Sequence, residues 1–334
     1  MLIRLLGAQL RPYRRLLLGV VALQAVQTVA ALTLPTLNAR IIDDGILKGD
    51  QGFIRSTGAV MLAFALVQVA FSVGAVLLGA RVAMGFGRDL RATLFHQVTS
   101  FSSREVGELG APSLITRITN DVQQVQALVV MASTMAIAAP LTMVVGIVMA
   151  LRQDVGLSIV LLVSMPVAAV ILGMLVSQMM PTFRVMQGRI DDINRVLREQ
   201  ITGIRVVRAF VREPQESRRF ETVNHELTAT SLRAGRLMSS LFPTVNVLIN
   251  MSSVGVLWLG ADRVASGEIQ LGSLVAYLSY LVQILMSVVL ATFVIAMVPR
   301  ASVSAQRIME VLDTSSTVVP PADPVTEVTK RGHL

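Results

Sequence analysis

Few side chains in this sequence have the types and spacing that catalysis needs. Cysteine is absent, and the three histidines, His96, His225 and His333, lie far apart, so the sequence indicates neither a thiolate nor a histidine metal cluster. The lysines are Lys48 and Lys330, and neither sits in the G-x-x-x-x-G-K-[ST] pattern that holds nucleotide phosphates. We therefore expect no catalytic residue, no metal site and no ATP hydrolysis by this chain alone.

A second set of candidates consists of polar side chains inside long apolar stretches. Two pairs, Gln24 with Gln27 and Asn246 with Asn250, are three and four residues apart, so each pair shares one face of a helix. Facing inward, such groups would line a mostly apolar cavity suited to a hydrophobic or amphipathic substrate. The alternative is hydrogen bonding between packed helices, worth about 0.6 kcal/mol each in membranes. The predicted cavity residues are Gln24, Gln27, Gln68, Asn246, Asn250, Tyr277, Tyr280 and Gln283.

The elements that carry these residues are six stretches without Asp, Glu, Lys, Arg or His. Only 15% of the 334 residues are charged, against about 25% in soluble domains. A bilayer core of about 30 Å needs about 20 apolar residues in a helix, so each stretch is long enough to cross once. The predicted spans are 16–39, 56–80, 122–151, 155–183, 237–261 and 269–299. The fold class that follows is an all-α membrane protein with six transmembrane helices.

The distribution of basic residues predicts the orientation of the spans. Of the 29 Lys and Arg residues, 24 lie in the N-terminus, in 81–121, in 184–236 or after span six. The positive-inside rule places this side, with both termini, in the cytoplasm. We expect a multi-pass protein of the plasma (inner) membrane, whose positive charge reflects topology and not nucleic-acid binding.

The two long cytoplasmic segments have the pattern of helical hairpins. In 184–236, apolar residues recur every three or four positions up to Val211, stop at Arg212-Glu213-Pro214 and restart at Phe220. The first arm, 184–211, would be roughly 40 Å long at 1.5 Å per residue. The other segment breaks at Gly110-Ala111-Pro112 before a helical period leads into span three. The apolar face of the longer hairpin indicates a neighbouring hairpin that covers it.

Three motifs in these segments resemble those of ATP-binding cassette (ABC) exporters. Residues 113–126, preceded by Gly110, are similar to the first intracellular loop of that family, and 201–210 to the second loop. Ala305 to Asp313 is similar to the exit from the sixth helix. The resemblance covers about residues 12–313 and is greatest to actinobacterial multidrug or lipid half-transporters.

The resemblance implies that each hairpin tip carries a short coupling helix that contacts a nucleotide-binding domain, at about 110–117 and 209–216. It also implies a domain-swapped dimer, in which the second tip reaches the domain of the partner subunit. We expect Phe210 to insert into that domain, because an aromatic residue at a tip has no local core to join; the alternative is packing against the neighbouring hairpin. The expected contact residues are Ala111, Pro112, Ser113, Leu114, Arg117, Ala209, Phe210, Val211, Arg212, Glu213 and Glu216, although the charged members have the alternative of a simply solvated tip.

The same resemblance implies the partners and the energy source. ATP and Mg²⁺ would bind on nucleotide-binding domains outside this sequence, and the partners would be those domains, a second half-transporter and the lipid bilayer. We expect one membrane domain over 1–313, followed by a Ser/Pro-rich linker over 314–334 that leads to a nucleotide-binding domain.

Two alternatives to an ATP-driven exporter remain at this point. Some proteins of the same fold import siderophores, and nothing in the spans distinguishes the direction of transport. A passive channel or a membrane scaffold is the alternative from a different class, and it would act without any ATPase.

Overall fold

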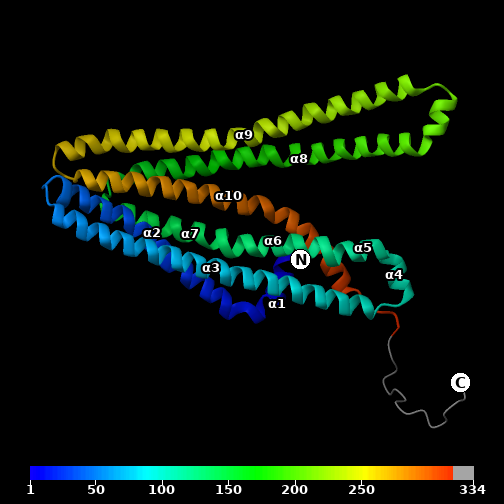
Figure 1. The fold of residues 1–334 in the computed structure, drawn as a ribbon, viewed down its shortest axis with the longest axis horizontal. Coiled ribbons are helices and arrows are strands. Elements are labelled where there is room, and N and C mark those ends of the chain that lie inside the picture. The colour runs from blue at the N-terminus through cyan, green and yellow to red at the C-terminus, as the bar shows by residue number, and fades with distance from the viewer. Residues whose placement is uncertain (319–334) are drawn as a thin grey trace, which may run out of the picture. The chain divides into compact units, whose positions relative to one another are not determined.

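The computed structural model describes residues 1–318, and all the regular structure in that range is helical (Figure 1). The α-helices are α1 (Leu2–Gln9), α2 (Arg14–Arg40), α3 (Gln51–Thr99), α4 (Ser103–Leu109), α5 (Ala111–Thr116), α6 (Val122–Met131), α7 (Ile137–Gln153), α8 (Ser158–Ala209), α9 (Glu213–Ala265) and α10 (Leu271–Asp313). A short 3₁₀ segment, η1 (Arg11–Tyr13), precedes α2, and three π-helical segments are η2 (Ile41–Ile46), η3 (Arg117–Asp121) and η4 (Ala132–Ala136).

Several of these segments join without a break into longer helical stretches. Within residues 1–318, six stretches are long and apolar enough to cross a bilayer: Arg11–Ile46, Gln51–Thr99, Ala111–Gln153, Ser158–Ala209, Glu213–Ala265 and Leu271–Asp313. The prediction of an all-α protein with six long transmembrane helices is confirmed. The expected domain limits, 1–313 and 314–334, stay a prediction, and residues 319–334 of that linker lie outside the described residues.

The chain forms two compact units. Unit 1 comprises Met1–Gln27, Val69–Ile137 and the described part of Val294–Leu334, and unit 2 comprises Thr28–Gln68 and Ala138–Phe293. Four of the six long stretches contribute to both units, whereas α8 and α9 belong entirely to unit 2.

The core of unit 1 forms where α1, the second half of α3, α5 and α6 pack against the last turns of α10. Phe86, Leu90 and Leu94 follow one another at four-residue spacing on α3 and are fully buried. Leu114 of α5 and Ile308 of α10 join the same cluster. The helical period of the sequence therefore determines which face of α3 is covered.

A π-helical segment interrupts the third long stretch within unit 1. Pro140, four residues after Ala136, has no N–H to donate to the carbonyl of Ala136, so the regular ladder fails here. The side-chain nitrogen of Gln24 donates to the carbonyl oxygens of Ser133 (2.8 Å) and Thr134 (3.1 Å). Gln24 thus satisfies backbone groups of the irregular segment.

The core of unit 2 includes a tight contact between η2 and the start of α10. The backbone N–H of Gly272 donates to a carboxylate oxygen of Asp43 over 2.7 Å in a buried position. A Cβ at Gly272 would lie 2.3 Å from the carbonyl oxygen of Ala39, so only glycine fits. Asp43 therefore satisfies one of the free N–H groups at the N-terminus of α10.

The longest feature of unit 2 is the antiparallel hairpin of α8 and α9, whose helices lie side by side (Figure 1). Ion pairs join the two helices along the hairpin: Arg189 with Glu226 (2.7 Å) and, closer to the tip, Arg219 with Glu199 (2.7 Å). These pairs are partly exposed, so each is worth at most about 1 kcal/mol, and they set the register of the hairpin more than its stability.

Candidate functional site

The tip of the first predicted hairpin segment is built from α4 and α5, in unit 1. Ser102 and Glu105 form a capping box at the start of α4, because the Ser102 side chain accepts from the backbone of Arg104 and Glu105 accepts from the backbone N–H of Ser102. Gly110, with φ of 77°, ends α4 and begins α5. A left-handed residue is needed here for the chain to reverse, and glycine supplies it without strain.

The residues expected to make contacts at the first tip differ in exposure. Ala111 and Pro112 are exposed and Ser113 is half-buried, whereas Leu114 packs into the core of unit 1. Arg117 is also buried, and its guanidinium pairs with the carboxylate of Glu310 over 2.8 Å. Leu114 and Arg117 thus hold α5 and η3 in place in this structure, and the free part of the tip is Ala111 to Ser113.

One exposed apolar residue at this tip did not figure in the sequence prediction. Ile115 lies on α5 with 64% of its surface exposed, beside the buried Leu114. The helical period provided the signal, because Leu114, Ile118 and Val122 belong to the packed face and leave Ile115 on the outer one. Ile115 joins Ala111 and Pro112 as part of the surface that this tip presents.

The tip of the second segment is a three-residue turn, Phe210 to Arg212, between α8 and α9. Phe210 and Val211 are 72% and 76% exposed. Val211 is the residue other than glycine with a positive φ, 53°, in the described chain. A β-branched residue in this conformation is strained, and such strain is frequent at functional sites.

The expected short helices at the two tips are not separate helices in this structure. The first corresponds to α5, which forms the first turns of the continuous stretch Ala111–Gln153, and at the second tip α8 continues to Ala209 and α9 begins at Glu213. Glu213 is exposed and Glu216 is half-buried, where it accepts a hydrogen bond from Gln200 (3.0 Å). The Arg212 side chain donates to Gln215, so Arg212 stays close to the start of α9.

An apolar stripe on α8 remains uncovered next to the second tip. Leu197, Ile201 and Ile204 are spaced four and three residues apart, and they are 41%, 74% and 46% exposed. Three large apolar side chains on one helical face form a surface that a partner normally covers.

The structure divides the predicted cavity residues into two groups. Gln24, Tyr277 and Tyr280 are buried and satisfy backbone carbonyl groups in their own units: the Tyr277 hydroxyl donates to Leu157 (2.9 Å) and the Tyr280 hydroxyl to Leu32 (2.9 Å). These contacts correspond to the alternative, in which the polar groups join packed helices.

The other predicted cavity residues are more accessible. Gln27, Gln68 and Gln283 are half-buried, and Asn246 and Asn250 are exposed on α9. Two apolar grooves of about 540 and 430 Å³ lie on unit 2, along α7 and α8 and along α8 and α9, and neither is lined by any of the eight residues. The placement of the eight residues at a substrate cavity stays a prediction.

Comparison with known proteins identifies the family to which these features belong. The model of the ABC transporter transmembrane region matches residues 17–288, which include both tips and four complete predicted spans.

Relatives of known sequence are similar over almost the whole chain. A Mycobacterium tuberculosis protein named "uncharacterized ABC transporter ATP-binding protein" is 48% identical over 97% of this chain and 56% of its own length. A Mycobacterium bovis protein named "multidrug efflux ATP-binding/permease protein" is 27% identical over 95% of this chain and 26% of its own length. An "ATP-dependent lipid A-core flippase" of Syntrophus aciditrophicus is 23% identical over 90% of this chain and 50% of its own length. The chain thus spans about half the length, or less, of these relatives.

Proposed function

The chain belongs to the ABC transporter transmembrane-region family, and on that premise we propose that it is the translocation domain of an ATP-driven exporter. The substrate would be hydrophobic or amphipathic, a drug or a lipid, moved out of the cytoplasm or the inner leaflet. Two relatives with such activities in their names, a multidrug efflux protein and a lipid A-core flippase, support this substrate class.

ATP and Mg²⁺ would bind to nucleotide-binding domains that work with this chain. The residues of the chain itself do not fit an ATP site, since neither lysine sits in a phosphate-binding loop. Those domains would supply the free energy of ATP binding and hydrolysis. The residues of this chain would receive their movement at the two tips and pass it to the spans.

The exposed turn at Phe210 is the observation that carries this proposal. A phenylalanine with 72% of its surface exposed, next to a strained valine, has no packing function within its own hairpin. An aromatic side chain of this kind is a typical anchor in a pocket of another protein. We propose that Phe210 and Val211, with the surface of Ala111 to Ser113, contact the nucleotide-binding domains.

Replacing Phe210 by alanine in the complete transporter tests this role. We expect ATP-dependent transport to fall about tenfold or more, because an interface anchor contributes 2 kcal/mol or more, while the protein still folds. Phe95→Ala is the matched control, since Phe95 is also an exposed phenylalanine (63%) but belongs to α3 and not to the turn. Equal transport by Phe210→Ala and the unaltered protein would remove Phe210 from the mechanism. Uptake into inside-out vesicles measures the direction, and uptake only into right-side-out vesicles would identify an importer.

We propose further that the working form contains a second half-transporter, identical or related. The uncovered stripe of Leu197, Ile201 and Ile204 supports a neighbour of the same kind. Because the sequence has no cysteine, Ile201→Cys introduces a single thiol, and we expect it to form a disulfide-linked dimer when isolated membranes are treated with an added thiol oxidant. Arg195→Cys, which is exposed on another face of α8, is the control. If the Ile201→Cys protein and the Arg195→Cys protein both stay monomeric while the transporter is active, pairing through this stripe is contradicted.

The orientation proposed from the basic residues places both tips and both termini in the cytoplasm of a plasma membrane. Labelling of the single thiols in intact cells tests it: a thiol at position 201 should be protected from a membrane-impermeant reagent. Labelling from outside would reverse the proposed topology.

A further inference from the structure

Polar contacts join the end of α10, and the residues directly after it, to the other helices of unit 1. Ser304 donates to Asp121 (2.9 Å), Glu310 pairs with Arg117 (2.8 Å) and Asp313 pairs with Arg4 (3.1 Å). After α10 ends, residues 314–317, here called the exit segment, add two more contacts. The carbonyl oxygen of Thr314 accepts from Gln97 (2.7 Å), and Thr317 reaches α4.

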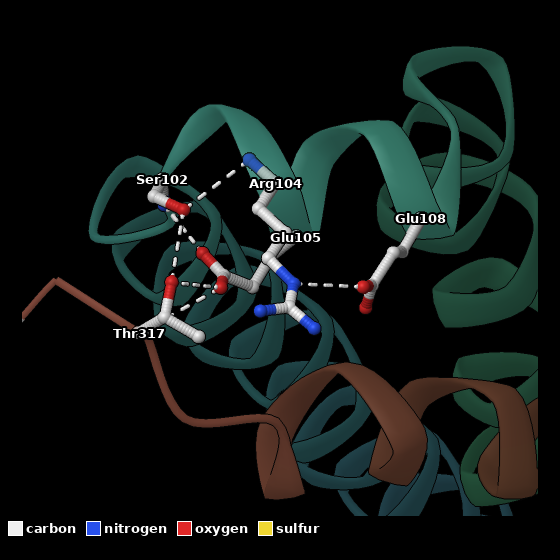
Figure 2. A network of polar contacts seen from close by, with 5 residues as sticks. All are labelled: Ser102, Arg104, Glu105, Glu108 and Thr317. Atoms are coloured by element: carbon white, nitrogen blue, oxygen red, sulfur yellow. Dashed lines mark hydrogen bonds and ion pairs between the residues drawn. The ribbon is translucent and has the colours of Figure 1, made fainter.

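Glu105 receives the exit segment at the start of α4 (Figure 2). One carboxylate oxygen accepts from the backbone N–H of Ser102 (2.7 Å), as the capping box requires. The other accepts from the hydroxyl of Thr317 (2.6 Å) and from its backbone N–H (3.2 Å). Figure 2 shows the Thr317 side chain next to both Ser102 and Glu105, and the hydroxyl oxygens of Thr317 and Ser102 are 3.2 Å apart.

The hydrogen positions in this cluster follow from its acceptors. A carboxylate only accepts, so the Thr317 hydroxyl donates to Glu105, and the Ser102 hydroxyl, 3.2 Å away, is left to donate to Thr317. The Ser102 oxygen still accepts from the backbone N–H of Arg104. Each polar atom of the cluster thus has a partner, and the exit segment supplies two of the three donors to Glu105.

Glu105 is almost fully buried, at 3% exposure, and is held by neutral donors in place of a basic side chain. The nearby Arg104 pairs with Glu108 instead (3.0 Å). Hydrogen bonds from Ser102 and Thr317 lower the pKa of the Glu105 carboxyl from its ordinary 4.5 to about 2. The negative charge is therefore present at physiological pH, and it is stabilised by the exit segment.

We infer that Glu105 is a positioning residue that anchors the exit segment to α4, so that the first cytoplasmic tip and the chain leaving α10 move as one body. This inference rests on the proposed function in one respect, namely that the chain beyond residue 317 leads to a domain that moves. Movement of that chain would then be transmitted to α4 and α5 of the same subunit through Glu105. It would act in parallel with the contacts at the tips.

Hydrogen exchange on the 334-residue chain in lipid nanodiscs tests the anchor without any transport assay. Glu105→Gln is the informative variant, because glutamine also fits the capping box and keeps α4 formed, but removes the charge that Thr317 faces. We expect the amide of Thr317 to exchange at least about tenfold faster, since hydrogen bonds to charged groups contribute about 1.5–3 kcal/mol. Thr317→Val, which removes the hydroxyl, should act in the same direction, and Thr317→Ser should restore slow exchange.

The control for this experiment is Glu108→Gln, on the same helix. Glu108 is exposed and pairs with Arg104, and its contacts do not include the exit segment. We expect exchange at Thr317 to be unchanged in this variant. Unchanged exchange in Glu105→Gln, or equally fast exchange in Glu108→Gln, would overturn the anchor.

A second measurement tests whether the anchor carries movement in the complete transporter. We expect Glu105→Gln and Thr317→Val to lower the amount of substrate moved per ATP hydrolysed, with Thr317→Ser and Glu108→Gln at the unaltered value. An unaltered ratio in Glu105→Gln, when its exchange is fast, would overturn the transmission of movement. Absence of ATP-dependent transport in the unaltered protein would instead refute the proposed function, while the exchange result would still decide the anchor.

Discussion

The two hairpin tips are held in opposite ways, although their sequences look alike as breaks between apolar helices. The first tip is fixed within its own unit: Leu114 lies in a core, Arg117 pairs with Glu310, and Glu105 binds Thr317. The second tip, Phe210 to Arg212, has exposed side chains and a strained residue. The first tip is therefore fixed within its own unit, whereas the second exposes the side chains that we propose contact a nucleotide-binding domain.

The largest effect expected from this comparison is on the stability of the first tip. Leu114→Ala should lower the free energy of unfolding by about 2–5 kcal/mol, because it removes a buried leucine side chain from the core of unit 1. Thermal unfolding in detergent measures the change. The neighbouring Ile115→Ala is the control, and together with Phe210→Ala it should stay within about 0.5 kcal/mol of the unaltered protein. An equal loss in Leu114→Ala and Phe210→Ala would end the distinction between the tips.

A smaller effect of opposite sign is expected at the second tip. Val211→Gly should raise the free energy of unfolding by about 0.5–1 kcal/mol, since it relieves about 1–2 kcal/mol of left-handed strain and loses part of that gain to chain entropy. The measurement is again thermal unfolding. Val206→Gly, four residues before the turn begins and inside α8, should instead lower it by about 0.3–0.5 kcal/mol. Destabilisation by both glycines would show that position 211 is not strained.

The smallest expected effect is the pH dependence of the contact between Glu105 and the exit segment, which appears only in acid. The folded-state pKa of Glu105 is about 2, below the ordinary 4.5, so docking of the exit segment is at full strength above about pH 4.5 and is lost as the pH falls toward 2. The exchange rate of the Thr317 amide in Glu105→Gln, divided by that in the unaltered chain, should therefore be large at pH 5 and approach one near pH 2. Neighbouring charges from Arg104, Glu108, Arg4 and Asp313 are common to both proteins, so the ratio isolates Glu105. A ratio that does not change over this range would contradict the assignment.

The six long helices could be predicted from the sequence because helices that cross a bilayer lack charged residues over about 20 positions. The sequence also predicted the first tip from Gly110 and the second from Pro214, since glycine allows the left-handed conformation of a reversal and proline interrupts a helix. Local rules of this kind act over a few residues, so a single sequence is enough to apply them.

The polar contacts were harder to predict, because residue type does not determine direction. Tyr277 and Tyr280 are as suitable for a cavity as for packing, and only the folded chain shows that their hydroxyls meet the carbonyl groups of Leu157 and Leu32. Ser102 and Glu105 form an S-x-x-E pattern that the sequence displays, but their contact with Thr317 spans 212 positions or more and has no local signal.

The docked exit segment has a practical meaning for hybrid proteins. In a hybrid that joins this chain to the nucleotide-binding domain of a relative, a junction placed before Thr314 would bring in a foreign exit segment that was never matched to Ser102 and Glu105. A junction placed after Val318 keeps the native exit segment together with Ser102 and Glu105. Recombination between members of the family, in the laboratory or in nature, is therefore expected to succeed more often at the second boundary than at the first.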